Sequence, residues 1–171
     1  VFTAGRLWDP VKNTPLLDRV AALLPVPFEA AGSQTGPHGE AVTCRNLVTP
    51  GPLPAGAIAA RLAARPIFVS AARFEPFGLA VLEAAQAGCP LVLSGLSTFR
   101  ELWTGAALIV PEQDDRAYAA AIERILGDDA LRHHLGEAAR IRAQRYTPHA
   151  TAASVAAVYA GLLGDPHRVA A

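Results

Sequence analysis

The chain has 171 residues, of which 51% are hydrophobic and 18% are charged. This length suits one compact domain with its own core, and the composition excludes an intrinsically disordered chain. Lys and Arg together number 15, as do Asp and Glu, so no bulk charge attracts nucleic acid or an anionic membrane. Any anionic ligand must therefore meet local donors.

The cysteines and the apolar runs indicate where in the cell the protein is located. Cys44 and Cys89 lie far apart and have no metal-ligand spacing, which is typical of reduced thiols in an intracellular protein. No apolar run reaches the roughly 18 residues that cross a bilayer. The N-terminus has no signal-peptide features and no initiator Met, so we expect a cytoplasmic domain cut from a longer chain.

Short apolar runs alternate with helical patterns, as in βα units that build a parallel sheet. The predicted strands are the apolar runs at residues 1–5, 28–32, 42–48, 67–70, 90–94 and 107–110. The predicted helices cover residues 14–24, 54–64, 77–87, 114–126, 129–145 and 150–163, with a helical turn at 99–103. The sequence thus predicts a single α/β domain over 1–171, a Rossmann-like doubly wound parallel sheet of about six strands with a helical tail from about residue 128.

Open parallel sheets bind ligands beyond the carboxyl ends of their strands. Four loops follow such ends, after Gly5, Gly32, Val48 and Ser70. Several polar residues fall in these loops, which is the first indication of a site.

Glu75 stands directly before Pro76, which we expect to be the first residue of a helix. Glu75 would then lie at the helix entrance, beside the free backbone N–H groups of Phe77, Gly78 and Leu79. The helix dipole favours an anion there, and Gly78 allows a ligand to approach the backbone closely. A plain N-cap role for Glu75 remains the alternative.

Glu83 lies two turns further along, in a helix whose other residues are mostly apolar. A carboxylate beside such a surface needs hydrogen-bond donors, such as the two hydroxyls of a ribose. Alternatively, Glu83 and Gln86 form the solvent edge of the helix.

Two cations follow the first strand. Arg6 leaves its carboxyl end, and Lys12 lies near the start of the next helix, for which Thr14 is the expected N-cap. An Arg side chain can donate two hydrogen bonds to one phosphate, and Lys acts as a point charge, so the pair suits a diphosphate. Two solvated surface cations are the alternative.

The loop after the second strand contains Gly32 and Ser33 and could lie against a phosphate or sugar, or could be a plain connection. No G-x-G-x-x-G follows the first strand and no P-loop is present, which disfavours dinucleotide binding and P-loop hydrolysis. Neither the five histidines nor the cysteines have metal-ligand spacing, so we expect no metal site.

Together these segments resemble the retaining, nucleotide-sugar-dependent glycosyltransferases of group 1, also called family 4, which have the GT-B fold. Residues 73–84, Arg-Phe-Glu-Pro-Phe-Gly-Leu-Ala-Val-Leu-Glu-Ala, are similar to the family's Glu-x7-Glu signature. Residues 87–92 are similar to its small-residue turn into the next strand, and Gly5-Arg6-Leu7 with Lys12 and Asn13 resembles its phosphate-binding segment. The likeness runs in order over residues 1–126.

The resemblance implies the C-terminal, donor-binding half of a GT-B hexosyltransferase that retains the configuration at the anomeric carbon. Arg6 and Lys12 would neutralise the donor diphosphate, Glu75 would contact the transferred sugar, and Glu83 would hold the ribose. The backbone of residues 77–79 would hold sugar and phosphate, and the backbone near Thr49 would bind the base. The substrate would be a nucleoside diphosphate sugar such as a UDP- or GDP-hexose, with no cofactor and no required metal.

These enzymes use two Rossmann-like domains, and 171 residues hold one. The resemblance therefore implies an N-terminal domain outside this sequence, which would bind a saccharide, lipid-linked or small-molecule acceptor and could bring the enzyme to the inner membrane. We expect the chain alone to bind donor and transfer nothing. The competing interpretations are a non-catalytic nucleotide-sugar sensor of the same fold and an epimerase of the same two-domain architecture.

Overall fold

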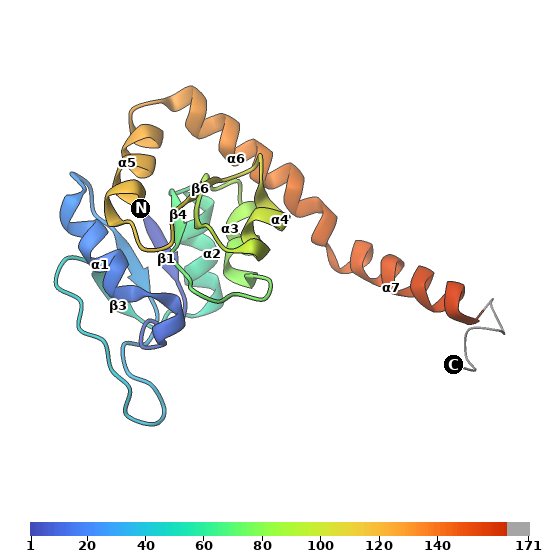
Figure 1. The fold of residues 1–171 in the computed structure, drawn as a ribbon, viewed down its shortest axis with the longest axis horizontal. Coiled ribbons are helices and arrows are strands. Elements are labelled where there is room, and N and C mark those ends of the chain that lie inside the picture. Colours follow the sequence, from blue (N-terminus) through green and yellow to red (C-terminus); the bar gives the residue numbers. More distant parts are fainter. Residues whose placement is uncertain (164–171) are drawn as a thin grey trace.

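The computed structural model describes residues 1–163 (Figure 1). The strands in chain order are β1 (Phe2–Ala4), β2 (Glu29–Ala31), β3 (Val48–Gly51), β4 (Phe68–Ser70), β5 (Leu91–Ser94) and β6 (Leu108–Val110). The helices are α1 (Thr14–Leu23), α2 (Ala55–Ala63), α3 (Leu79–Gln86), α4 (Ser97–Trp103), α5 (Asp115–Leu126), α6 (Asp129–Ala143) and α7 (Pro148–Leu163), with 3-10 turns η1 (Pro10–Lys12) and η2 (Gln144–Tyr146). Residues 164–171 of the predicted domain lie outside the described part.

The six strands form one parallel sheet in the order β3-β2-β1-β4-β5-β6. The predicted doubly wound sheet is therefore confirmed. The chain winds outward from β1 to β3, returns through α2 to β4 beside β1, and then winds outward the other way. This order places the topological switch point, where such sheets bind ligands, between β1 and β4.

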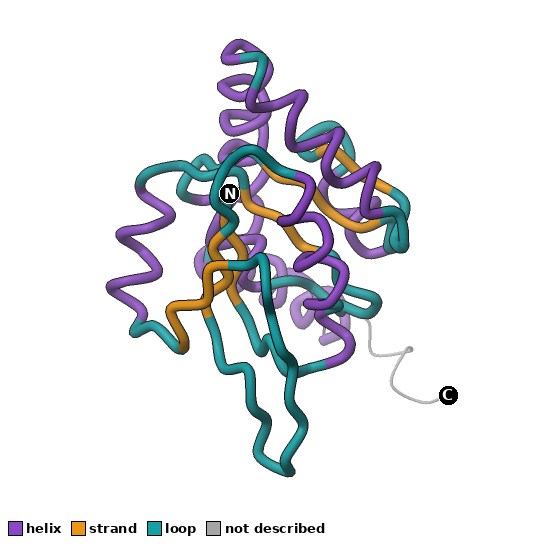
Figure 2. Tube along the Cα trace, turned by 90° about the vertical axis from the view of Figure 1, so that its left-hand side faces the viewer, coloured by secondary structure: helices purple, strands orange, loops and turns teal. Residues whose placement is uncertain are grey.

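Helices cover both faces of the sheet (Figure 2). Successive residues of β4 point to opposite faces, so Phe68 joins the core under α2, α3, α4 and α6, whereas Val69 joins the core under α1 and α5. Both residues are at most 2% exposed. Burial on both faces explains why the strands are continuous apolar runs instead of alternating patterns.

The predicted strand at 42–48 is wrong, because the third strand begins at Val48 and runs to Gly51. The Asp18 carboxylate on α1 accepts hydrogen bonds from the backbone N–H groups of residues 45, 46 and 47 at 2.9, 2.9 and 3.0 Å. These groups are thereby held away from the sheet. Pro50 is accepted in β3 because β3 is an edge strand.

Asp18 should make stability depend on pH. Burial alone would raise the pKa of Asp18, but the backbone N–H groups of residues 45–47 outweigh it and lower the pKa below 3.8. Because the folded-state pKa is depressed, the stabilisation is full at neutral pH and is lost as the pH falls from about 4 through the folded pKa. We expect Asp18→Asn to lower the free energy of unfolding by about 1–2 kcal/mol at pH 7.

Urea denaturation of wild type and Asp18→Asn at pH 7 and below pH 4 measures this difference. The free energies of unfolding of the two proteins should become equal below pH 4. An equal gap at both pH values would show that the charge of Asp18 does not hold the loop.

Two predicted helix starts are also wrong. Asn13, in the left-handed region at φ 57°, precedes α1, and Thr14 is not the N-cap because its hydroxyl donates to the Leu7 carbonyl at 2.6 Å. Pro76 does not begin α3, because Gly78 at φ 92° interrupts the helical backbone and α3 starts at Leu79. In both cases a left-handed residue turns the chain sharply at the carboxyl edge of the sheet.

Gly136 lets α6 pack closely on the turn before β5. A Cβ at Gly136 would lie 2.4 Å from the Gly88 carbonyl oxygen, whereas a Cβ at Gly161 on α7 would meet nothing within 4 Å. Gly to Ala normally stabilises an exposed helix by about 1 kcal/mol. We therefore expect the two substitutions to change stability in opposite directions. Gly161→Ala should stabilise α7 slightly, and Gly136→Ala should lower the free energy of unfolding by about 2 kcal/mol or more. Thermal and urea unfolding measure both, and a stabilised Gly136→Ala would contradict the packing.

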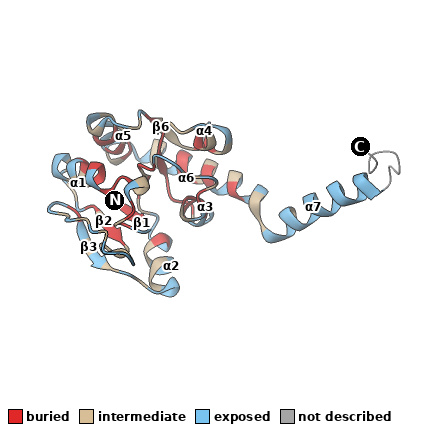
Figure 3. Ribbon diagram, turned by 60° about the horizontal axis from the view of Figure 1, so that its bottom comes forward, coloured by how far each residue is buried: buried red, intermediate tan, exposed pale blue. Residues whose placement is uncertain are grey.

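α7 extends away from the body of the domain and is exposed along its length (Figures 1 and 3). Its apolar side chains include Val158, Tyr159 and Leu163, which are 61%, 62% and 83% exposed. Of the helices described, none is both long enough and apolar enough to cross a membrane.

Candidate functional site

Lys12 and Glu75 meet at the switch point of the sheet. Lys12 comes from the loop after β1 and Glu75 from the loop after β4, 63 residues later. The Lys12 Nζ donates to Glu75 Oε2 at 2.5 Å, and the two side chains are only 28% and 17% exposed. The sequence contains no other lysine, so Lys12 is the single primary ammonium among its side chains.

Backbone hydrogen bonds fix the loop that carries Lys12. The Asp9 carboxylate caps η1 by accepting from the Val11 N–H at 3.1 Å. The Arg73 N–H donates to the Val11 carbonyl at 2.8 Å, which joins the loop after β4 to η1. Lys12 and Glu75 are thus brought together by the backbone as well as by their charges.

A small crevice opens beneath this ion pair, with a volume of about 30 Å³. Its lining includes the loop ends of β1 and β4 and the start of α3, through Thr3, Gly5, Lys12, Ser70, Glu75 and Gly78. The crevice is water-sized, so a larger ligand must lie over it. The neighbouring Asn13 is 5% exposed and its Nδ2 has no hydrogen-bond partner within residues 1–163.

Gly5 and Gly32 bring the loops after β1 and β2 into backbone contact. A Cβ at Gly32 would lie 1.7 Å from the Gly5 carbonyl oxygen, and Gly32 has φ 149°. Only glycine fits there. Ser33 follows in the same loop and its carbonyl accepts from the Trp8 N–H at 3.2 Å, while its hydroxyl donates to the Thr35 carbonyl at 2.6 Å.

Arg6 lies at the same edge but outside the crevice. Its guanidinium pairs with Asp9 at 2.7 Å and its Cζ is 5.6 Å from the centre of the Trp8 ring. The Arg6 side chain is 63% exposed, so this ion pair is weak and leaves the guanidinium able to turn toward a ligand.

The start of α3 presents free donors beside Glu75. No hydrogen bond within the described residues uses the backbone N–H of Phe77, Gly78 or Leu79. The Phe77 ring packs edge-on against Tyr146, with ring centres 5.4 Å apart, which anchors this turn to η2. An anionic or hydroxyl group over the crevice would meet these N–H groups.

Of the predicted site residues, Gly5, Lys12, Glu75 and Gly78 line the crevice and the others do not. Glu83 is exposed on α3 and lines a groove of about 480 Å³ between α2 and α3. Thr49 lies within β3, not after it, and its hydroxyl accepts from Gln34 Nε2 at 3.4 Å. A second groove of about 1050 Å³ lies between α3 and α7, with Phe77, Leu79, Glu83, Tyr146 and Tyr159 among its lining residues.

Two residues shape the site in ways that were not predicted. Asn13 turns the chain from η1 into α1, and the backbone of Arg73 ties the two loops together. An asparagine after lysine and before a helix start is a recognisable left-handed turn, whereas the Arg73 contact leaves no sequence signal. Within residues 1–163 no three His, Cys, Asp or Glu side chains gather as metal ligands; His167 lies outside the described residues.

Comparison with known proteins identifies the family. The model of the family "Glycosyl transferases group 1" matches residues 45–142, more than half of the chain. D-inositol 3-phosphate glycosyltransferase of Jonesia denitrificans is 36% identical over 90 residues, which are 51% of this chain and 21% of that protein. Phosphatidyl-myo-inositol mannosyltransferase of Mycolicibacterium smegmatis is 36% identical over 92 residues, 53% of this chain and 24% of that protein.

Solved structures agree in fold. Sucrose-phosphate synthase from Thermosynechococcus elongatus superposes with a TM-score of 0.81 and 26% identity over 95% of this chain and 45% of that one. The HepE protein of Anabaena, solved with UDP and glucose, has a TM-score of 0.77 and 17% identity over 94% of this chain and 48% of that one. The chain thus spans about half of these GT-B structures, and it belongs to the group 1 glycosyl transferases, the retaining family with the GT-B fold.

Proposed function

We propose that this chain is the donor-binding domain of a hexosyltransferase and holds a nucleoside diphosphate sugar at the carboxyl edge of its sheet. The observation that carries the proposal is the contact between Lys12 and Glu75 at the switch point, beside the free N–H groups at the start of α3. A cation, a carboxylate and backbone donors within one edge match the diphosphate and the hydroxyls of such a donor.

Each group has a role in transfer. The bond between the anomeric carbon and the diphosphate oxygen breaks, and the hydroxyl oxygen of the acceptor bonds to the same carbon and gives its proton to the departing diphosphate. Negative charge collects on the diphosphate as it leaves. Lys12 and Arg6 stabilise that charge, an electrostatic contribution of the kind that often dominates catalysis. Glu75 exchanges its contact with Lys12 for a sugar hydroxyl, and the N–H groups of residues 77–79 orient sugar and phosphate.

The preference for lysine over arginine supports this assignment of Lys12. The sequence has 15 basic residues, of which 14 are Arg, yet the position beneath the diphosphate is Lys. An ammonium is a compact point charge that fits beside a water-sized crevice, whereas the planar guanidinium needs more room.

Glu83 would bind the ribose hydroxyls from α3, and the groove between α2 and α3 leaves space for the nucleoside. The base would lie near Thr49 and the residues that follow β3. Cys44 and Cys89 are free thiols, which fits a reducing, cytoplasmic compartment.

Transfer would need a second domain. An apolar helix that is exposed on all sides normally packs against another structure, and α7 is such a helix. The solved relatives are about twice as long as this chain, which supports an N-terminal domain that covers α7 and binds the acceptor. On this proposal the isolated chain binds donor without turnover.

Calorimetric titration with uridine, guanosine and adenosine diphosphate sugars tests the proposal. One series should bind, and its affinity should fall in Glu83→Gln but not in Glu123→Gln, which makes the same change at an exposed position on α5. Binding that ignores Glu83 would favour a nucleotide-sugar sensor, and no binding at about 1 mM donor would refute a donor site.

A further inference from the structure

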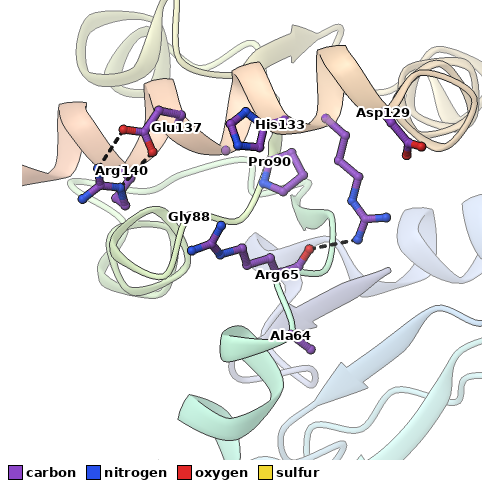
Figure 4. Close-up of a pocket in the computed structure, with 10 residues that line it drawn as sticks. Ala64, Arg65, Gly88, Pro90, Asp129, His133, Glu137 and Arg140 are labelled. Atoms are coloured by element: carbon purple, nitrogen blue, oxygen red, sulfur yellow. Dashed lines mark hydrogen bonds and ion pairs between the residues drawn. The ribbon is translucent and has the colours of Figure 1, made fainter.

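A second polar pocket lies at the opposite edge of the sheet, away from Lys12 and Glu75. It has a volume of about 350 Å³, within the usual range for small-ligand sites (Figure 4). Arg65 and Gly88, in the turns before β4 and β5, form one wall, and Arg132, His133 and Arg140 of α6 belong to the other. The proposed donor function uses none of these residues.

The charges of the pocket leave two guanidinium groups available. Arg140 is engaged by Glu137 through two hydrogen bonds at 2.9 and 2.7 Å, and this contact lowers the pKa of the Glu137 carboxyl. Arg65 and Arg132 form no ion pair with any carboxylate in residues 1–163. The remaining acid, Asp129, lies at the end of the pocket away from Arg140 and Glu137 (Figure 4).

The backbone holds these groups in place. Arg65 has a left-handed backbone at φ 50°, and its carbonyl accepts from the Arg132 Nη2 at 3.2 Å. The Arg65 side chain lies over Gly88, where a Cβ would be 3.5 Å from its Nε. Close approach of Gly136 to Gly88 then sets the distance between α6 and the turn.

We propose that this pocket is an anion site for a phosphate-bearing ligand, separate from the donor edge. Arg guanidinium groups donate paired hydrogen bonds to phosphate oxygens, and the pocket offers two of them with the His133 imidazole. The phosphate belongs either to a soluble phosphomonoester or to a lipid headgroup, because the recognised chemistry is the same.

Backbone NMR of the ¹⁵N-labelled chain, titrated with inorganic phosphate and with glycerol 3-phosphate, tests this site residue by residue. Amide signals of Arg65, Gly88 and residues 132–136 should shift saturably, with a dissociation constant of about 1 mM. Arg65→Ala and Arg132→Ala should each weaken this binding about tenfold. The matched control, Arg116→Ala, removes an exposed arginine on α5 and should leave it unchanged.

Phosphate can also bind at the donor edge, so Lys12→Ala separates the two sites. That variant should lose shifts near Gly5 and Gly78 and keep those at Arg65 and Gly88. An absence of binding at the donor edge would therefore leave the anion site intact, and an absence of binding at the anion site would leave the donor site intact. Absence of saturable shifts around Gly88, or equal binding by wild type and Arg65→Ala, would overturn the anion site.

Sedimentation with phosphatidic acid and phosphatidylcholine vesicles identifies the source of the phosphate. Binding only to the anionic vesicles, lost in Arg65→Ala and Arg132→Ala, would assign a lipid headgroup. Phosphomonoester binding without vesicle binding would assign a soluble ligand.

Discussion

Lys12→Ala is expected to weaken binding of the nucleotide-sugar donor about ten- to a hundredfold, the largest loss of any single side chain at the site. A hydrogen bond to a charged group contributes about 1.5–3 kcal/mol, which corresponds to that range. The substitution also leaves Glu75 without its partner at 2.5 Å, so an unneutralised carboxylate faces the diphosphate. Lys12→Arg keeps the charge but should recover only part of the affinity.

Calorimetry on the folded variants measures these affinities, and Arg116→Ala, an exposed arginine on α5, is the matched control. Removal of the diphosphate from the ligand provides a further check. Lys12→Ala should lose little affinity for the free nucleoside, because Lys12 faces the phosphates only. An equal loss for nucleoside and donor would place Lys12 elsewhere in the binding mode.

Gly32→Ala is expected to lower the free energy of unfolding by about 3 kcal/mol or more. The added Cβ would lie 1.7 Å from the Gly5 carbonyl oxygen, so the loops after β1 and β2 must separate. The backbone at φ 149° adds further strain for any residue with a side chain. Donor affinity should fall as well, because Gly5 lines the crevice beneath Lys12 and Glu75.

Gly39→Ala is the matched control for this effect. Gly39 also has a positive φ, 90°, but a Cβ there would meet nothing within 4 Å. It should therefore cost only about 1–2 kcal/mol, from the backbone conformation alone. Urea denaturation followed by circular dichroism compares the two, and similar losses would show that the contact between Gly32 and Gly5 is unimportant.

The order of strands and helices was predictable because each element carries its own local pattern. Residues 67–70 form a short apolar run between breakers, and β4 occupies nearly the same residues. The strand at 42–48 was misplaced because the conformation of this segment depends on a hydrogen bond from the Arg45 N–H to Asp18, 27 residues away. The Asp18 side chain and the loop at residues 45–47 are separated in the sequence by a strand. Hydrophobic periodicity describes local structure and does not predict such long-range contacts.

The candidate site also combines a predictable feature with contacts that could not be predicted. That Lys12 and Glu75 share one edge follows from parallel strands, since their carboxyl ends meet. Their direct contact did not follow, because it depends on the Arg73 to Val11 hydrogen bond and on the left-handed turn at Asn13. The anion pocket lay beyond prediction too: Arg65 and Arg132 are 67 residues apart, and their proximity depends on how α6 packs on the turn at Gly88.

The position of the diphosphate sugar against Lys12 can be tested on one atom. Because the sequence has a single lysine, reductive methylation with ¹³C-formaldehyde labels only Lys12 Nζ and the α-amine, and it keeps the positive charge. Titration with a donor that binds by calorimetry should move the Lys12 methyl signal saturably with the same dissociation constant, while the Val1 signal stays in place. A Lys12 signal that does not move while the donor binds would show that the diphosphate does not lie against Lys12.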